Sequence, residues 1–339
     1  MGLQIGEIIL KKEIGFSDLK GKTIAVDAFN AIYQFLTTIR QPDGTPLKDS
    51  NGNVTSHLSG LFYRNMNLIH EGIKIIYVFD GEPPLLKGRT INNRKEMKEE
   101  MKEKYKKAVE EKDIEAMGKY SRADVKLDEQ KINESKELLK AMGIAVLQAP
   151  SEGEAQASYL AKEGICYAVS SQDYDCLMFK APRLIQNLSM SRRRKIPTGF
   201  KEVFPQMIEL NAVLKELELS QEQLIVLGIL CGTDYNLGGV KGLGPKKSLK
   251  FVKEHKTKEG IFKAVEESEK YSLDFDWREI YEIIENPEVI KNPKIEFPNI
   301  DKEKIKSILS KYEFSEDRIE SQLDKLDAII KKKSQKTLF

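Results

Sequence analysis

The feature that most constrains the fold is a set of short apolar segments, several of which end at acidic residues. Residues 23–26 form one such segment, which ends at Asp27, and residues 73–79 form another, which ends at Asp80. The other segments of strand-like composition are 144–149, 167–171 and 183–188. The helical patterns that separate these segments include 55–71 and 129–142. Strands that alternate with helices predict an α/β fold with a mostly parallel, doubly wound sheet flanked by helices.

The composition limits the class of protein more than its function. The 339 residues suit one large α/β domain or two small ones, and a formal net charge of +2 excludes no partner. No apolar run is long enough to span a membrane, and the N-terminus lacks the pattern of a secretory signal. The three cysteines, Cys166, Cys176 and Cys231, are widely spaced. We therefore expect small buried thiols in a reducing compartment, and no zinc site.

Seven carboxylates are predicted to gather at one edge of the sheet. They are Asp27, Asp80, Glu152, Glu154, Asp173, Asp175 and Asp234. Most follow the end of an expected strand or open the next helix, and ligands bind at that edge of an open parallel sheet. Without compensation these groups would repel one another and raise one another's pKa. A site made only of oxygen ligands favours Mg²⁺ or Mn²⁺.

Each of these acids also has a simpler interpretation when it is taken alone. Glu154 could be the third residue of a capping box with Ser151 at the N-cap, and Asp80 before Gly81 could be a turn residue. Asp27 is harder to explain in this way, because it lies inside an apolar stretch. The metal-site hypothesis therefore rests on the whole set.

The region 87–131 differs from the rest of the chain. Its helical pattern has one narrow apolar stripe, Met97, Met101, Tyr105 and Ala108. A helix with so little apolar surface is expected to stand away from the body of the protein. The chain becomes mainly helical from residue 220, and the polar, basic tail 331–339 is expected to be flexible.

The order of several segments resembles that of the flap endonucleases, which are structure-specific 5′ nucleases. The segments are VDAFNAIYQFL, YVFDGEPPLLK, APSEGEAQASYLAKEG, SSQDYD and GTDYNLGGVKGLGPKK. The resemblance covers nearly the full length and is closest in character to archaeal members. It implies a 5′ flap endonuclease with 5′–3′ exonuclease activity that acts on DNA near single-strand/duplex junctions in Okazaki-fragment maturation and repair.

The resemblance implies roles for the acidic residues. All seven carboxylates would be ligands of two Mg²⁺ ions, with Mn²⁺ as a substitute. Asp27, Asp80, Glu152 and Glu154 would form an inner group, and Asp173, Asp175 and Asp234 a second group. Cleavage would leave a 5′-phosphate and a 3′-hydroxyl without a side-chain nucleophile.

Four other residues match the catalytic machinery of the family. Lys87 and Arg94, which are seven residues apart on an expected helix face, would reach the scissile phosphate from a helical arch formed by 87–131. A solvated charged helix is the alternative for this region. Tyr33 would stack on a base near the cut, worth about 1–3 kcal/mol, unless it is a core tyrosine. Gly2 would lie near the active site.

A glycine-rich stretch resembles a helix–hairpin–helix clamp for duplex DNA. The clamp would span about 221–256, and its predicted contact residues are Gly239, Lys241, Gly242, Gly244, Lys246 and Lys247. Backbone N–H groups there would bind phosphates, and a K⁺ ion bridges such a hairpin to DNA in the family. Arg40 and Thr55 match residues around a 3′-flap pocket. The basic stretch 191–195 is expected to be an exposed turn.

The tail resembles a shortened sliding-clamp-binding motif made by Gln335, Leu338 and Phe339.

For the chain as a whole we expect one nuclease domain over 1–330, a flexible tail, a monomer without membrane contact, and a cytoplasmic location. The expected partners are branched DNA with a 5′ flap and the sliding clamp. The rival interpretations are a non-catalytic DNA-junction binder, a ribonuclease with a related metal site, and another 5′ nuclease of the same superfamily.

Overall fold

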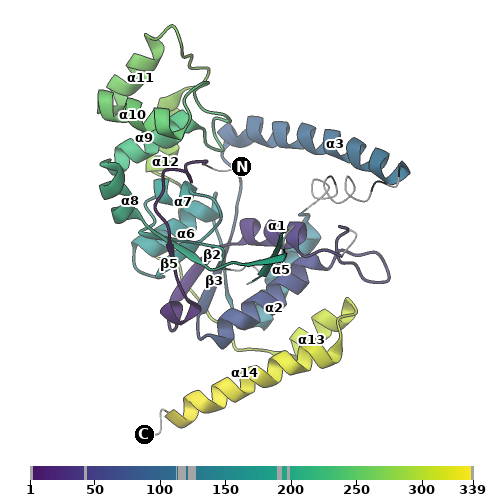
Figure 1. The fold of residues 1–339 in the computed structure, drawn as a ribbon. Helices are drawn as coiled ribbons and strands as arrows, with labels where there is room; N and C mark the ends of the chain where they lie inside the picture. Colours follow the sequence, from purple (N-terminus) through teal and green to yellow (C-terminus); the bar gives the residue numbers. More distant parts are fainter. Residues whose placement is uncertain are drawn as a thin grey trace.

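The computed structural model describes residues 3–41, 44–111, 113, 120, 127–188, 193–196 and 199–336, and within these ranges the side chains of a few residues, Arg94 among them, are not described. A seven-stranded sheet forms the centre of the molecule (Figure 1). Its strands are β1 (Lys12–Glu13), β2 (Thr23–Asp27), β3 (Lys74–Phe79), β4 (Ala145–Gln148), β5 (Ala168–Ser170), β6 (Arg183–Gln186) and β9 (Gln206–Glu209). They are arranged in the order β1-β9-β6-β5-β2-β3-β4.

The five strands β6, β5, β2, β3 and β4 are parallel, and β9 and β1 add an antiparallel edge. The chain builds β2, β3 and β4 in one direction and then returns to add β5 and β6 on the other side of β2. The order of strands therefore reverses between β2 and β5, which is where an open α/β sheet forms its ligand crevice.

Side chains alternate between two apolar cores because successive residues of a strand point to opposite faces. In β3, Ile75, Tyr77 and Phe79 belong to one core, and Ile76 and Val78 belong to the other. The first core also receives helices α1 (Ala28–Thr38), α2 (Ser56–His70), α5 (Glu129–Ala141), α13 (Lys302–Lys311) and α14 (Glu316–Lys336). The second receives α6 (Gly153–Lys162), α7 (Asp175–Met178), α8 (Leu210–Leu217), α9 (Gln221–Cys231), α10 (Pro245–His255), α11 (Lys258–Glu266) and α12 (Trp277–Glu285). This confirms the predicted doubly wound α/β fold with a C-terminal helical region.

A single long helix begins the region that the sequence marks as unusual. The 3₁₀ turn η2 (Leu85–Lys87) leads into α3 (Gly88–Glu110), which projects from the body (Figure 1). Along its expected apolar stripe, Met101 and Tyr105 are half-buried and Ala108 is buried. Much of the remainder of 87–131 lies outside the described residues. The expectation that this helix stands away from the sheet is confirmed for α3.

Four strands of the described residues, β1, β7, β8 and β9, were not expected from the sequence. β9 pairs with β6, and β1 pairs with β9 through Lys12 opposite Met207. A separate hairpin joins β7 (Arg193–Ile196) to β8 (Gly199–Glu202), so the prediction of a turn over 191–195 is wrong for residues 193–195. These strands are short or polar, so their own composition does not predict strand structure. They are strands because they pair with neighbouring segments.

The C-terminal region ends in a long helix. Helix α14 extends through Lys336, and Ile319, Leu323 and Leu326 lie on one face and are buried against the core. The flexibility of the tail 331–339 stays a prediction. Gln335 lies in this helix, whereas Leu338 and Phe339 lie outside the described residues.

The expectations about cysteines and membrane spans can be checked in the same part of the chain. Cys166 and Cys176 are buried free thiols, and Cys231 is a half-buried free thiol. None of the helices within the described ranges is long and apolar enough to cross a bilayer.

Candidate active site

Three of the predicted carboxylates lie at the carboxyl ends of neighbouring parallel strands. Asp27 is the last residue of β2, Asp80 directly follows β3, and Asp173 follows the end of β5. Asp27 also caps α1, because its Oδ1 accepts a hydrogen bond of 3.1 Å from Asn30 N. This cap was not predicted from the sequence; it uses only Oδ1 and does not by itself exclude a metal contact of the same carboxylate.

The two glutamates come from the beginning of α6, but not in the way the sequence predicted. The N-cap of α6 is Glu152 and no side chain caps the helix, so the capping-box interpretation with Ser151 is wrong. Ser151 is instead held by its backbone, since Gly81 N donates to Ser151 O at 2.6 Å. Glu154 accepts a hydrogen bond of 2.6 Å from Ser171 Oγ and is thereby turned toward the end of β5.

The last two carboxylates come from α7 and from the turn after α9. Asp175 is the first residue of α7, and its Oδ1 accepts a hydrogen bond of 2.8 Å from the backbone N of Leu3. Asp234 lies past the end of α9, with Oδ2 3.5 Å from Lys87 Nζ. The N-terminal segment therefore reaches the acidic site at Leu3, whereas Gly2 lies outside the described residues.

The pKa shifts indicate that these carboxylates lie close enough to repel one another. Burial, followed by the charge of Asp80, raises the pKa of Asp27 to about 8. Burial also raises the pKa of Asp80 to about 6 and, together with the charge of Asp173, that of Asp175 to about 7. Burial and the charge of Asp27 raise the pKa of Glu154. Without a counter-ion the site therefore favours protonated carboxyl groups.

Sequence reasoning missed the polar groups that orient the carboxylates. Asn30 bridges two of them, because its backbone N bonds Asp27 and its Nδ2 donates to Asp173 Oδ2 at 3.0 Å. Gly153 N donates to Asp80 Oδ1 at 2.6 Å. The position of Asn30, three residues after Asp27, is a cap spacing that could have indicated its first contact but not its second.

The carboxylates described above accept hydrogen bonds from protein groups. Among the residues that the structure describes, no three His, Cys, Asp or Glu side chains are arranged to hold a metal ion. The donor chemistry nevertheless fits a divalent cation, because the set contains only carboxylate oxygens, and burial and mutual repulsion raise the pKa of Asp27, Glu154 and Asp175. A cation at this site would replace protons and hydrogen-bond partners, which requires side chains to turn.

The ammonium group of Lys87 approaches this site. Its Nζ pairs with Glu152 Oε1 and lies 3.5 Å from Asp234 Oδ2. Burial opposes the charge of Lys87, but Glu152 and Asp234 outweigh it and raise the pKa of Lys87. Lys87 ends the turn η2 and Gly88 begins α3, so the expectation that Lys87 and Arg94 share a helix is wrong for Lys87.

Three further predicted residues have structural contacts of their own. Tyr33 is half-buried and packs against the core that contains α1. Arg40 donates to the carbonyl oxygens of Thr37 and Gly44 at 3.1 and 2.8 Å, which closes the end of α1. Thr55 is buried at the start of α2. The stacking and flap-pocket roles of these residues stay predictions.

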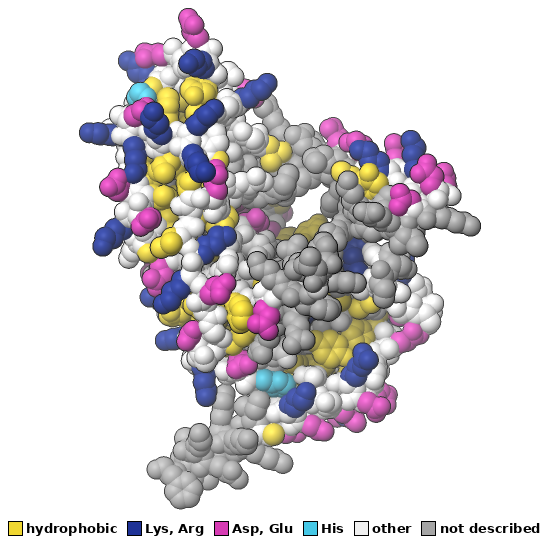
Figure 2. Space-filling model, in the orientation of Figure 1, with side chains coloured by type: hydrophobic (Ala, Val, Ile, Leu, Met, Phe, Trp, Pro, Cys, Tyr) yellow, Lys and Arg dark blue, Asp and Glu magenta, His cyan; other side chains and the backbone are white. Residues whose placement is uncertain are grey.

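The glycine-rich stretch connects α9 to α10 as a compact hairpin. Gly239 has a φ of +58°, and a side chain there would collide with the backbone oxygen of Leu230. Val240 N donates to the same oxygen at 2.9 Å, which fixes the turn against α9. The predicted contact lysines, Lys241, Lys246 and Lys247, are exposed. Figure 2 shows Lys and Arg side chains, mixed with acidic ones, over the α10–α11 end of the molecule.

Comparison with known proteins supports one family for the whole chain. The XPG N-terminal domain matches residues 4–101, and the XPG I-region matches residues 143–234. Flap endonuclease 1 of Pyrococcus furiosus is 49% identical over 341 residues, which cover 100% of this chain and 98% of that relative. Flap endonuclease 1 of Aeropyrum pernix is 46% identical over 98% of this chain and 96% of its own length. The chain belongs to the flap endonuclease family.

The two matched regions of this family member enclose the acidic site. Asp27 and Asp80 lie within the first region, and the carboxylates from Glu152 to Asp234 lie within the second. The structure is similar to a flap endonuclease-1 from Methanococcus jannaschii, with a TM-score of 0.75 and 41% identity over 98% of this chain and 100% of that one. The catalytic core of Rad2 in complex with DNA has the same fold, with a TM-score of 0.72 and 22% identity over 95% of this chain and 97% of that one.

Proposed function

We propose that this flap endonuclease family member is a structure-specific 5′ nuclease that cleaves DNA phosphodiesters near single-strand/duplex junctions. The observation that carries the proposal is the convergence of carboxylates from β2, β3, α6 and α7 at the point where the strand order reverses. Relatives of nearly the same length that carry the name flap endonuclease 1 support the same activity.

Metal ions would supply the chemistry, and the carboxylates would hold them. Asp27, Asp80, Glu152 and Glu154 would bind one of two Mg²⁺ or Mn²⁺ ions, and Asp173, Asp175 and Asp234 the other. Bound ions of this kind lower the pKa of water and stabilise the attacking and leaving oxygens of a phosphodiester. The protein's part is to keep these carboxylates together despite their repulsion, through Asn30, Ser171 and the backbone of Gly153 and Leu3.

Lys87 and Arg94 would act on the substrate. The Lys87 ammonium lies among Glu152 and Asp234 at the base of α3, so a short movement would bring it to a phosphate oxygen next to the same carboxylates. Arg94 would act from the first turns of α3. Tyr33 would stack on a base near the cut, and Gly2, adjacent in sequence to Leu3, would contact the substrate at the same edge.

The hairpin between α9 and α10 would bind duplex DNA. Lys241, Lys246 and Lys247 are exposed beside the start of α10, whose N-terminal N–H groups suit phosphate oxygens. Such contacts are independent of sequence, so binding would weaken steeply with salt. Bound K⁺ would assist at Gly239, Gly242 and Gly244. Arg40 and Thr55 would border a pocket for a short 3′ flap.

The cellular role that we propose is removal of 5′ flaps during Okazaki-fragment maturation and DNA repair, with 5′–3′ exonuclease activity in addition. Residues 1–330 would act as one nuclease domain and as a monomer in the cytoplasm. The C-terminal segment with Gln335 would bind the sliding clamp. Gln335 itself lies in the last turn of α14.

A labelled double-flap junction tests the proposal directly. With Mg²⁺ we expect one main cut within a nucleotide or so of the junction, and with EDTA we expect none. Asp173→Ala should abolish cutting and leave junction binding in Ca²⁺ largely intact. Junction binding without cutting in the wild-type protein would instead support the non-catalytic binder.

A further inference from the structure

Tyr235 makes contacts at the acidic site that the proposed function leaves without a role. Its hydroxyl donates a hydrogen bond to Glu152 Oε2. The other oxygen of the same carboxylate, Oε1, pairs with Lys87 Nζ. The two oxygens of Glu152 therefore have different partners, one a neutral donor and the other a cation.

The turn that carries Tyr235 is held by hydrogen bonds of its own. Thr233 N and Oγ1 donate to Asn236 Oδ1 at 3.0 and 2.7 Å, and Asn236 Nδ2 donates to Ile229 O at 2.7 Å. Tyr235 N in turn donates to Thr233 Oγ1 at 3.1 Å. Thr233 and Asn236 are both buried. These bonds hold the backbone that carries Tyr235 against the end of α9.

The Tyr235 ring also borders the space that the lysine occupies. Lys87 Nζ lies 5.5 Å from the ring centroid, within the range of a cation–π contact. Tyr235 and Glu152 both line a pocket of about 480 Å³, together with Pro150 and Ile283. The ring itself is half-buried and packs against the core that contains α9.

We propose that Tyr235 is a positioning residue whose hydroxyl fixes Glu152 Oε2 and thereby presents Glu152 Oε1 to a cation. In the structure that cation is the Lys87 ammonium, and a divalent ion held by Glu152 would take the place of the ammonium. The inference rests on the proposed function, because it treats Glu152 as a metal ligand.

Tyr235→Phe removes the hydroxyl and keeps the ring. We expect affinity for Mn²⁺ alone, measured without DNA by electron paramagnetic resonance, to fall about tenfold, as for other groups that orient metal ligands. In flap cleavage the half-saturating Mn²⁺ concentration should rise by a similar factor, and the rate at saturating Mn²⁺ should stay within about twofold of wild type, because the ion, once bound, holds Glu152 itself.

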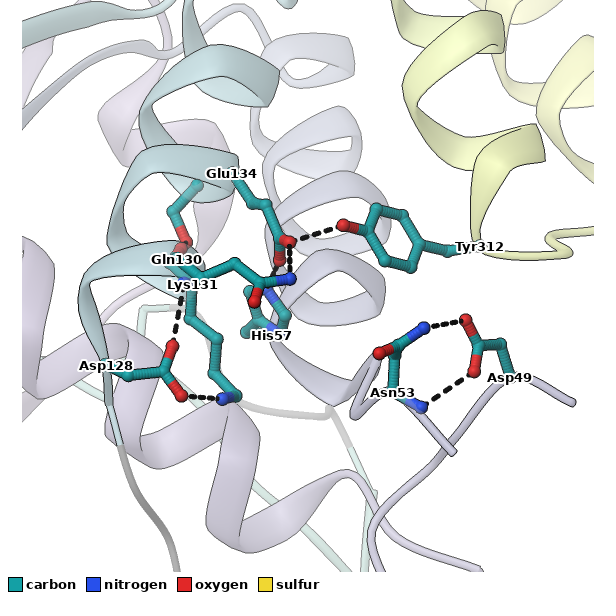
Figure 3. A network of polar contacts seen from close by, with 9 residues as sticks. Asp49, Asn53, His57, Asp128, Gln130, Lys131, Glu134 and Tyr312 are labelled. Carbon is teal, nitrogen blue, oxygen red and sulfur yellow. Dashed lines mark hydrogen bonds and ion pairs between the residues drawn. The ribbon is translucent and has the colours of Figure 1, made fainter. Parts of the chain in front are cut away.

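Tyr312→Phe is the matched control. Tyr312, just after α13, also donates its hydroxyl to a carboxylate, that of Glu134 on α5, in a separate polar network (Figure 3). Tyr312→Phe should lower the melting temperature and leave Mn²⁺ affinity unchanged. Wild-type Mn²⁺ affinity in Tyr235→Phe, or an equal loss in Tyr312→Phe, would overturn the inference.

A double-mutant comparison asks whether Tyr235 acts through Glu152. In a Glu152→Gln background, Tyr235→Phe should cause no further loss of Mn²⁺ affinity. A further tenfold loss there would overturn the inference, since Tyr235 would then act elsewhere. Failure of the proposed function has a different result, because the wild-type protein itself would then neither bind Mn²⁺ nor cut the flap.

Discussion

The contact between α6 and the end of β3 makes Gly153 a sensitive position in the candidate site. A Cβ atom added at Gly153 would lie 2.5 Å from Asp80 Oδ1 and 3.0 Å from Val78 O. Ordinary van der Waals contact begins at 3.4 Å, so the carboxylate of Asp80 must move by 0.9 Å or α6 must shift. The movement would also stretch the hydrogen bond from Gly153 N to Asp80 Oδ1, now 2.6 Å.

Gly153→Ala is therefore expected to damage catalysis more than folding. Overpacking of this kind costs about 1–3 kcal/mol of unfolding free energy. Misplacement of a catalytic group by about 1 Å can lower a rate about 100-fold. We expect a drop of that order in the single-turnover rate of flap cleavage, while junction binding in Ca²⁺ changes little, because Asp80 is not among the predicted contact residues of the hairpin.

The control for this prediction is Gly15→Ala. A Cβ at Gly15 meets only the exposed Ser17 hydroxyl, at 3.1 Å, and other atoms beyond 3.4 Å, so both rate and stability should stay near wild type. If Gly153→Ala cleaved flaps at the wild-type rate with an unchanged melting temperature, Asp80 and α6 could not be packed as described, and the reasoning would be refuted.

The remaining predictions concern charge and the C-terminal helix. The pKa of Asp27 is about 8 in the folded protein and close to 3.8 when unfolded, so the folded state binds more protons between these values. The unfolding free energy of the metal-free protein should therefore fall as pH rises through this window, and Mg²⁺ should raise the melting temperature more at pH 8 than at pH 5; a Mg²⁺ effect independent of pH would contradict this. Lys87→Ala should slow single-turnover cleavage at least tenfold with little loss of junction binding, and an unchanged rate would remove Lys87 from the site. Deleting residues 331–339 should leave basal cleavage intact and abolish stimulation by the sliding clamp. Leu323→Ala removes a buried contact of α14, so it should lower the unfolding free energy by about 2–5 kcal/mol and with it the melting temperature.

The cysteine and helix-capping predictions show how local patterns can succeed or fail. Cys166 and Cys176 are buried as expected, because a free cysteine behaves as a small apolar side chain and packs in the core. The Ser151 cap failed, although its sequence pattern is a good one. The loop after β3 pairs with the backbone of Ser151 through Gly81, a contact between distant segments, and the N-cap of α6 is Glu152 rather than Ser151.

Strands β2 to β6, helices such as α2 and α5, and the acids that follow the strands could be predicted from the sequence, because periodicity and strand-end composition are local properties. The polar groups that meet those acids became known only from the folded structure: Asn30 on Asp173, Tyr235 on Glu152 and Lys87 between Glu152 and Asp234. The physical reason is that these contacts join segments far apart in the chain, and their geometry depends on strand order and on packing, which no local pattern encodes.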